Sequence, residues 1–378
     1  MSMPAVASRP CNSFTVPRLL GLAALLAGLA GCGGGDDERP YARRCGLPTT
    51  EASRLPAPTG GSCVGKAGFL ALDGARLDPY AGNGSPRELS LKVWYPIHST
   101  PRAARADYMD AQVWSVVRQA VPALPAAQAP TNARKEASLN QGRRHPVLLF
   151  SPGWGAPVEV YSSLLEDMAS HGYVVVAINH PYLSGPTLLS GGRLVVNNGV
   201  AQPSDASMAT MVADQRFVLD WLKARDAEPA GHHLLAGRLD LSRVGAYGHS
   251  FGGSAALQTS RQDARVQAGI DIDGSVYGER KQPWTKPLMF LLSEDSGANG
   301  GTVPSIEEVW KLRQGPGKRE VLAGSKHNGF ADIKFLLGSQ LAQAPEDLRR
   351  EFGRIDAQQA LRWTREQTRD FMGSHLRR

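Results

Sequence analysis

The sequence predicts an α/β fold with a mostly parallel central sheet. From about residue 145 onward, near-continuous apolar runs alternate with segments of helical periodicity. Such runs are expected of parallel strands buried on both faces, and their alternation with helices is typical of a sheet covered by helices. A third observation is a Gly-x-Ser-x-Gly turn at residues 248–252, which stands between a predicted strand and a predicted helix.

The composition is that of a chain with a sizeable core. Hydrophobic residues make up 42% and charged residues 20% of the 378 residues, which excludes a wholly disordered chain, a disulfide-stapled miniprotein and a collagen. The length allows two domains or one large α/β domain. Lys and Arg outnumber Asp and Glu by 42 to 35, a formal net charge of +7, but the arginines are scattered. We therefore expect a solvated basic surface and no nucleic-acid partner.

Residues 1–31 predict a signal for export. Arg9 and Arg18 precede an apolar run at residues 19–31, and no acidic residue occurs before this run. The run is too short for an ordinary membrane span, and its position behind a positive segment is typical of a signal peptide.

A cysteine follows the apolar run directly. Residues 29–32 read Leu-Ala-Gly-Cys and resemble the lipobox of bacterial lipoproteins. The resemblance implies that Cys32 becomes a lipidated N-terminus, which anchors the protein in a membrane of the bacterial cell envelope. Because Gly33 and not Asp follows the cysteine, we expect the outer membrane if the source has two membranes. An ordinary signal peptide with an incidental cysteine is the alternative.

Residues 32–66 are rich in Gly, Pro and Asp and show little periodicity. They predict a lipidated flexible tether, followed by a domain over residues 67–378. Because an exported protein meets an oxidising compartment, Cys45 and Cys63 are predicted to form a disulfide, with two free thiols as the alternative.

The elements of the domain can be assigned in order along the chain. Residues 89–96 alternate between apolar and polar side chains and predict a half-buried strand. Residues 97–145 are rich in Ala, Pro and Arg, contain one predicted helix at residues 109–121, and are expected to form a cap insertion over the site. Further strands are predicted at residues 147–150, 173–178, 244–247, 266–272, 288–292 and 319–322. Further helices are predicted at residues 158–170, 206–225, 250–262, 305–313 and 357–376.

The turn at residues 248–252 predicts a nucleophilic serine. In such an elbow Ser250 occupies a strained strand-to-helix turn, which exposes its hydroxyl at the carboxyl edge of the sheet. Gly248 and Gly252 have no Cβ, so the crossing segments can approach closely. The N-terminus of the next helix offers free N–H groups to a developing oxyanion. A Gly-rich turn with a purely structural role is the alternative.

A serine nucleophile needs a histidine base and a carboxylate that orients this base. In α/β-hydrolases the order along the chain is Ser, acid, His, and only His327 and His375 follow Ser250. His375 stands beside arginines near the C-terminus and is expected on the surface, so His327 is the predicted base. Asp273 and Asp295 each follow the end of a predicted strand, and the pattern leaves both open as the acid.

Two backbone N–H groups are expected to hold the oxyanion. One belongs to Phe251, the residue after the nucleophile. The other must come from residues 151–155, where Pro152 has no N–H and cannot donate. Gly153 and Trp154 remain as the second donor.

Several spaced motifs resemble the plasma-type (group VII) platelet-activating factor acetylhydrolases. The likeness covers about residues 89–340. The motifs are Gly248-His-Ser-Phe-Gly-Gly253, Phe150-Ser-Pro-Gly-Trp-Gly155 with Tyr161-Ser162, Ala169-Ser-His-Gly-Tyr173, Phe217-Val-Leu-Asp220, Gly269-Ile-Asp-Ile-Asp273 and His327-Asn-Gly-Phe-Ala-Asp332.

The resemblance implies an α/β-hydrolase fold and a serine esterase of short or oxidised acyl esters that needs no metal and no organic cofactor. It implies Ser250 as the nucleophile, His327 as the base and Asp273, rather than Asp295, as the acid. It also implies oxyanion donors at Phe251 and at one residue of the early loop, which is Trp154.

The chain departs from the family pattern at one position of this loop, where Pro152 replaces the usual His. With the lipobox, this departure favours a general carboxylesterase over a dedicated phospholipid hydrolase. We therefore expect a membrane-tethered serine carboxylesterase that acts on small-molecule or lipid esters of short acyl groups, phospholipid sn-2 acyl groups included. A polyester hydrolase, a lipase or a peptidase is the alternative within serine acyl chemistry. A non-catalytic envelope lipoprotein that keeps the fold for binding is the alternative from another class.

Overall fold

The structure is a computed structural model that describes residues 41–47, 55–99, 103–298 and 304–376. The predicted signal peptide, the lipobox and Cys32 lie outside the described residues. Within the described ranges, no helix has both the length and the apolar character needed to cross a membrane.

In the described residues, nine strands form one mixed sheet. The six strands from β11 to β5 run parallel, and β2 and β1 continue the sheet in antiparallel pairs. The order is β11 (Gly317–Leu322), β10 (Leu288–Ser293), β9 (Val266–Ile272), β8 (Leu239–His249), β4 (His145–Ser151), β5 (Val174–Asn179), β2 (Pro86–Ile97), β1 (Cys63–Leu77) and β3 (Ala133–Lys135). The predicted fold class, an α/β fold with a mostly parallel sheet, is confirmed.

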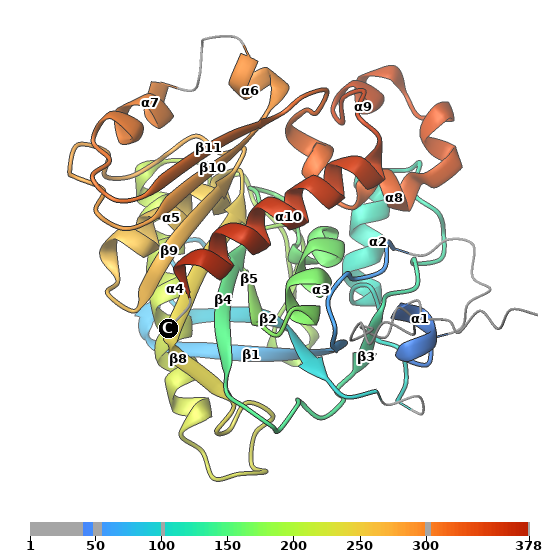
Figure 1. The fold of residues 1–378 in the computed structure, drawn as a ribbon, viewed down its shortest axis with the longest axis vertical. Coiled ribbons are helices and arrows are strands. Elements are labelled where there is room, and N and C mark those ends of the chain that lie inside the picture. The colour runs from blue at the N-terminus through green and yellow to red at the C-terminus, as the bar shows by residue number, and fades with distance from the viewer. Residues whose placement is uncertain (1–40, 48–54, 100–102, 299–303, 377–378) are drawn as a thin grey trace, which may run out of the picture. The chain divides into compact units, whose positions relative to one another are not determined.

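Helices cover both faces of this sheet (Figure 1). α3 (Ser162–Ser170) packs against α10 (Ala357–His375) on one face, and α4 (Asp205–Asp226) packs against α5 (Phe251–Gln262) on the other. β5 and β10 between these layers are buried along their whole length, as the continuous apolar runs predict. Shorter elements complete the described chain: α1 (Tyr41–Arg44), α2 (Ala111–Ala120), β6 (Thr187–Leu188), β7 (Leu194–Val195), α6 (Glu294–Ala298), α7 (Pro304–Lys311), α8 (Ile333–Leu337) and α9 (Glu346–Arg350).

The folded domain begins before residue 67, so the predicted extent of the tether is wrong. Tyr41 in α1 is buried, and its hydroxyl accepts a hydrogen bond from the N–H of Val64 in β1 (3.0 Å). A disulfide joins Cys45 to Cys63, which links the end of α1 to the start of β1. A segment without periodicity packs here because the aromatic ring and the cross-link stabilise it through contacts that a periodicity argument does not detect.

Part of segment 97–145 belongs to the sheet and is not a free cap insertion. β3 pairs with the beginning of β1, and the Arg134 guanidinium donates to the carbonyl oxygens of Cys45 and Gly46. The helix predicted at residues 109–121 is present as α2.

The carboxyl ends of the parallel strands meet at one edge of the sheet. Ser151, at the end of β4, lies opposite Gly248 of β8, and His249 of β8 lies opposite Ile272 of β9. The loops that follow these strands converge there, at the edge where open α/β sheets bind their ligands.

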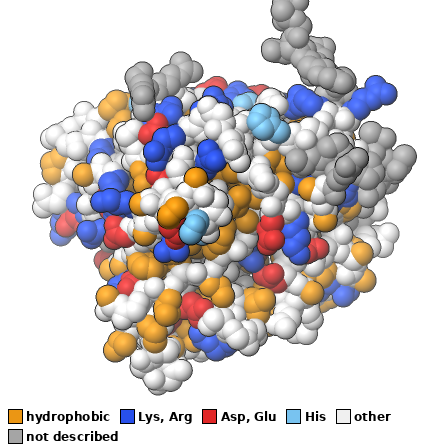
Figure 2. Space-filling view, turned by 90° about the horizontal axis from the view of Figure 1, so that it is seen from below, with side chains coloured by type: hydrophobic (Ala, Val, Ile, Leu, Met, Phe, Trp, Pro, Cys, Tyr) orange, Lys and Arg blue, Asp and Glu red, His pale blue; other side chains and the backbone are white. Residues whose placement is uncertain are grey.

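The surface carries charges of both signs. On the face shown in Figure 2, Lys and Arg side chains are interspersed with Asp and Glu side chains and with apolar ones. Several arginines are paired with carboxylates, as Arg280 is with Glu308 (3.0 Å) and Arg265 with Asp220 (2.5 Å). The positive net charge is therefore not gathered into one patch on this face.

Candidate active site

The predicted nucleophile stands on a strained turn. Ser250 lies between β8 and α5 with φ 56° and ψ −125°, a conformation that non-glycine residues rarely adopt. A Cβ on Gly248 would lie 2.3 Å from the carbonyl oxygen of Gly252, and a Cβ on Gly252 would lie 2.2 Å from the carbonyl oxygen of Ser151. Only glycine fits at either position, which explains both glycines of the motif.

His327 lies between Ser250 and Asp273. Its Nε2 atom is 3.0 Å from the Ser250 Oγ atom, and its Nδ1 atom is 2.7 Å from the Asp273 Oδ2 atom. Because an ionised carboxylate only accepts, Nδ1 carries the proton and Nε2 presents a lone pair to the Ser250 hydroxyl. The structure thus brings three of the predicted site residues together from the ends of three different strands.

Asp273 owes its position to the end of β9. The strand stops at Ile272, and Asp273 itself has φ 57°, so its side chain turns toward His327. Its Oδ1 atom accepts from the N–H of Ser293 (2.6 Å). Burial alone would raise the pKa of Asp273, but the hydrogen bonds from His327 and Ser293 outweigh it and hold the pKa below its ordinary value. The carboxylate is therefore ionised next to the imidazole.

The two neighbouring carboxyl groups point elsewhere. Asp295 is exposed and pairs with Lys326 (2.9 Å). Asp271 is fully buried under the elbow, where its Oδ1 atom accepts from the N–H of Gly274 (2.9 Å). Burial raises the pKa of Asp271 well above its ordinary value, so this carboxyl is neutral. Asp271 and Asp273 diverge because the strand does not persist between them.

The predicted oxyanion donors flank the nucleophile. Gly153 packs directly on Ser250, because a Cβ on Gly153 would lie 3.3 Å from the Ser250 Cβ. The Gly153 N–H is already engaged, since it donates to the Tyr161 hydroxyl (3.4 Å). In the part of the chain that the structure describes, the N–H groups of Phe251 and Trp154 donate to no protein acceptor. These two groups are therefore the ones free to bind a ligand oxygen.

Sequence reasoning missed two residues that support this geometry. The Nε2 atom of His249 lies 2.8 Å from the carbonyl oxygen of His327, and its Nδ1 atom lies 2.9 Å from the Tyr161 hydroxyl. Because the carbonyl only accepts, Nε2 carries the proton, and Nδ1 accepts from Tyr161. Burial, and then the nearby His327, lower the pKa of His249, which keeps its imidazole neutral. The signal was present: Tyr161 and His249 both stand inside the shared motifs, without an assigned role.

An apolar cavity opens beside this constellation. Its volume is about 380 Å³, and α2 contributes part of its wall. Gly155 and Asn328, the residues that follow Trp154 and His327, also line it, so the cavity adjoins the loops that carry the oxyanion donor and the base. The other apolar walls come from Val116, Val117, Val121, Ala156, Pro157, Val160, Pro186, Val196 and Ile333.

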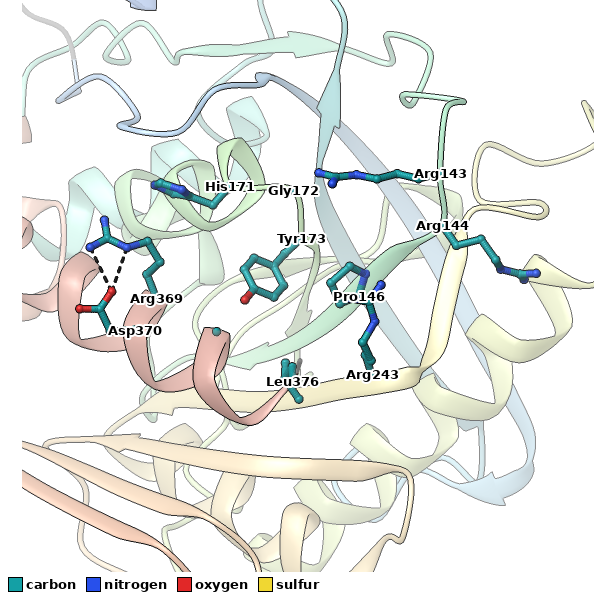
Figure 3. Close-up of a pocket in the computed structure, with 11 residues that line it drawn as sticks. Arg143, Arg144, Pro146, His171, Gly172, Tyr173, Arg243, Arg369, Asp370 and Leu376 are labelled. Atoms are coloured by element: carbon teal, nitrogen blue, oxygen red, sulfur yellow. Dashed lines mark hydrogen bonds and ion pairs between the residues drawn. The ribbon is translucent and has the colours of Figure 1, made fainter. Parts of the chain in front are cut away.

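Another cavity, of about 330 Å³, lies at the opposite ends of the strands (Figure 3). Arginines line it, but they do not converge on a common point. Arg369 is bonded to Asp370, and Arg144 and Arg243 are paired with Asp226 and Asp240. The charge of these three arginines is already compensated, and Arg143 by itself does not make a built anion site.

Comparison with known proteins shows which family the chain matches and which proteins it is similar to. Residues 88–187 and 231–378, more than half of the chain, match the family described as platelet-activating factor acetylhydrolase, isoform II. The platelet-activating factor acetylhydrolase of Cavia porcellus is 29% identical over 238 residues, which are 56% of this chain and 54% of that protein. A probable 1-alkyl-2-acetylglycerophosphocholine esterase of Arthroderma benhamiae is 31% identical over 208 residues, which are 51% of this chain and 50% of that protein. The chain therefore spans about half the length of these relatives.

A solved structure covers more of the fold. The ferulic acid esterase from Streptomyces cinnamoneus superposes with a TM-score of 0.73 and 27% sequence identity. The match covers 86% of this chain and 94% of that one. The predicted resemblance to acetylhydrolases and the α/β-hydrolase fold are both confirmed.

Proposed function

Since this chain belongs to the family of platelet-activating factor acetylhydrolase, isoform II, we propose that it hydrolyses carboxylic esters of short acyl groups with Ser250, His327 and Asp273 as a catalytic triad. The observation that carries the proposal is the hydrogen-bonded chain from the Ser250 hydroxyl through His327 to the buried Asp273. Any one of the three residues could occur by chance at a sheet edge, but the strained elbow and both hydrogen bonds together fit acyl transfer.

The geometry supports a two-step mechanism. His327 Nε2 takes the proton of Ser250 Oγ as this oxygen attacks the ester carbonyl, and Asp273 stabilises the imidazolium. The N–H groups of Phe251 and Trp154 donate to the oxyanion. The tetrahedral intermediate collapses to an acyl-enzyme when His327 returns the proton to the leaving alcohol. Water, deprotonated by His327, then attacks the acyl-enzyme. The second intermediate breaks its bond to Ser250 Oγ, which takes the proton back from His327, and the carboxylic acid leaves.

The cavity beside α2 supports a small apolar acyl or aryl group as the bound part of the ester. Its volume, about 380 Å³, is at the lower end of the range for small-molecule sites, and most of its wall is apolar. Because two relatives are named for the hydrolysis of acetylated phospholipids, the sn-2 acetyl group of a phospholipid is one substrate class to test.

We also propose that lipid at Cys32 keeps the domain near a membrane. Only residues 33–40 separate Cys32 from Tyr41, where the described fold begins. At no more than ~3.6 Å per residue, a segment of this length spans at most ~30 Å. Labelling with a palmitate analogue tests the anchor, which Cys32→Ala should abolish; labelling that persists in this variant would contradict it.

The function is tested with p-nitrophenyl esters from acetate to palmitate. The parent domain should hydrolyse the short esters, and Ser250→Ala should lose several orders of magnitude in kcat. Ser242→Ala is the matched control, since Ser242 lies on the same strand and its hydroxyl bonds locally, to the Asp240 carboxylate. Equal rates for the parent and Ser250→Ala would exclude Ser250 as the nucleophile. A parent that is inactive on every ester would favour a binding protein.

A further inference from the structure

A second Ser-His-Asp arrangement lies behind the loop that carries Trp154. The Oγ atom of Ser151 is 2.9 Å from His180 Nε2, and His180 Nδ1 is 2.9 Å from Asp214 Oδ2. Ser151, His180 and Asp214 are all 0% exposed, whereas His327 keeps 45% of its side chain exposed. An ester cannot reach the buried set, so this arrangement is not a second active site.

The direction of each hydrogen bond in this set follows from its charges. Arg87 donates to both carboxylate oxygens of Asp214 (3.2 and 2.8 Å). Burial alone would raise the pKa of Asp214, but Arg87 and the hydrogen bond from His180 hold it below its ordinary value. Burial lowers the pKa of His180, which is therefore neutral, donates from Nδ1 to Asp214 and accepts the Ser151 hydroxyl at Nε2. The Ser151 oxygen in turn accepts from Gln215 Nε2 (3.0 Å).

Ser151 is the point where this buried set meets the proposed site. It is the last residue of β4, and its carbonyl oxygen would lie 2.6 Å from a Cβ on Gly248 and 2.2 Å from a Cβ on Gly252. The next residues, 152–155, form the loop with the Trp154 N–H. A shift of Ser151 would therefore move this loop against the elbow.

The turn that contains His180 also binds the other end of the loop, at Gly155. His180 begins a turn after β5, in which its N–H donates to Ser184 Oγ (2.8 Å) and its carbonyl accepts from the Ser184 N–H (2.7 Å). Within this turn, the carbonyl oxygen of Leu183 accepts from the Gly155 N–H (2.9 Å). Ser151, before Trp154, and Gly155, after it, are thus both hydrogen-bonded to residues of this turn.

We propose that Ser151, His180, Asp214 and Gln215 form a positioning network that holds the Trp154 N–H at the oxyanion position. The inference rests on the proposed function for its effect on turnover. The network touches no reacting atom and transfers no proton during the reaction. It keeps a backbone donor in place, and a misplacement of about 1 Å at such a donor can cost roughly a hundredfold in rate.

The test compares Ser151→Ala with Gln215→Met and with a matched control, Ser260→Ala. Ser260 is equally buried, but its hydroxyl bonds only to the Leu257 carbonyl oxygen within α5. Each variant is first checked for its unfolding midpoint. We expect Ser151→Ala to lose about tenfold to a hundredfold in kcat on p-nitrophenyl acetate, Gln215→Met less, and Ser260→Ala under twofold, with KM changed little.

Two further readouts separate positioning from a general structural role. Phenylboronic acid forms a tetrahedral adduct that mimics the oxyanion, so its inhibition constant should rise in Ser151→Ala by the same factor by which kcat falls. Amide hydrogen exchange at Gly153 and Gly155, whose N–H groups are hydrogen-bonded in the parent, should speed up in Ser151→Ala and not in Ser260→Ala.

These readouts decide between the outcomes. Unchanged exchange in the loop, or a loss of kcat that only follows the loss of folded protein, would overturn the network. If the parent hydrolyses no ester, the proposed function fails, and the exchange experiment alone still decides whether the network holds the loop.

Discussion

The Nε2 atom of His249 lies 2.8 Å from the carbonyl oxygen of His327, so the residue beside the proposed nucleophile holds the backbone of the proposed base. The two rings also pack against each other, tilted by 41°, with centroids 4.6 Å apart. Through the Tyr161 hydroxyl, the same imidazole is connected to the N–H of Gly153. One buried, neutral histidine thus connects the loop of the base with the oxyanion loop.

His249→Phe should lower kcat on p-nitrophenyl acetate by about tenfold, because the carbonyl of His327 loses its donor and the base loses its fixed distance to Ser250. The same substitution at His375 in α10, outside the site, should leave kcat within twofold. Because burial keeps His249 neutral, the acid limb of kcat/KM in the parent should contain one titration and not two. A second titration that His249→Phe removes would contradict the neutral assignment.

The pair Asp271 and Asp273 offers a sharp comparison, since the same substitution should lower kcat strongly at one position and little at the other. Asp273→Asn removes the ionised partner of His327 Nδ1 and should lower kcat by about 10⁴-fold. Asp271 is held neutral by burial, so Asp271→Asn replaces an acid with an amide of the same shape and should cost less than about tenfold. Steady-state kinetics on p-nitrophenyl acetate measure both. Similar losses in the two variants would reject Asp273 as the acid.

The wall that α2 contributes to the apolar cavity should set the acyl length. Val116→Trp fills the cavity and should lower kcat/KM for hexanoate relative to acetate by at least tenfold, because the extra methylenes lose their space. Gln119→Trp places the same side chain on the exposed face of α2 and serves as the control. An unchanged hexanoate-to-acetate ratio in Val116→Trp would exclude this cavity as the acyl site.

Removal of the Cys45–Cys63 disulfide should destabilise the N-terminal segment. The two cysteines are 18 residues apart, and the cross-link of such a loop is worth about 3 kcal/mol of unfolding free energy on the chain-entropy model. Urea unfolding of the double variant Cys45→Ser/Cys63→Ser should show this loss. A reducing agent should cause the same loss in the parent and none in the double variant. No change of the midpoint under either condition would show that the bond does not form.

The contribution of Glu166 to the free energy of unfolding should fall as the pH rises from about 4 to about 7. Burial raises the pKa of Glu166 to about 7, so the folded state binds a proton that the unfolded state releases near its ordinary pKa of about 4.5. This contribution to stability is complete below the unfolded pKa and is lost as the pH passes through the folded pKa. Glu166→Gln should remove this downward contribution, so the unfolding free energy of the variant should have a more positive slope against pH over this window than that of the parent. A constant offset from the amide does not affect the comparison of the two slopes. An equal slope in both proteins would refute the raised pKa.

Local sequence patterns correctly predicted the buried strands of the central sheet. The run at residues 266–272 coincides with β9, and the run at residues 288–292 lies within β10, because strands buried on both faces must be apolar along their length. The packing of residues 41–47 and 55–66 escaped prediction, apart from the Cys45–Cys63 disulfide, because Tyr41 is buried by partners far along the chain and not by a periodic face.

The sequence by itself determined the α/β fold, the elbow at Ser250 and the choice of His327, since strand, turn, helix and chain order are local properties. The local pattern left Asp273 and Asp295 both open, and only the family resemblance favoured Asp273. The tertiary structure brings Asp273 to His327 and Asp295 to Lys326, because this depends on where β9 ends and which way each side chain then turns. It also decided which loop N–H groups are free and which histidines are buried and neutral. Hydrogen bonds between the ends of different strands decide these properties, and a single sequence does not encode such distances in any local pattern.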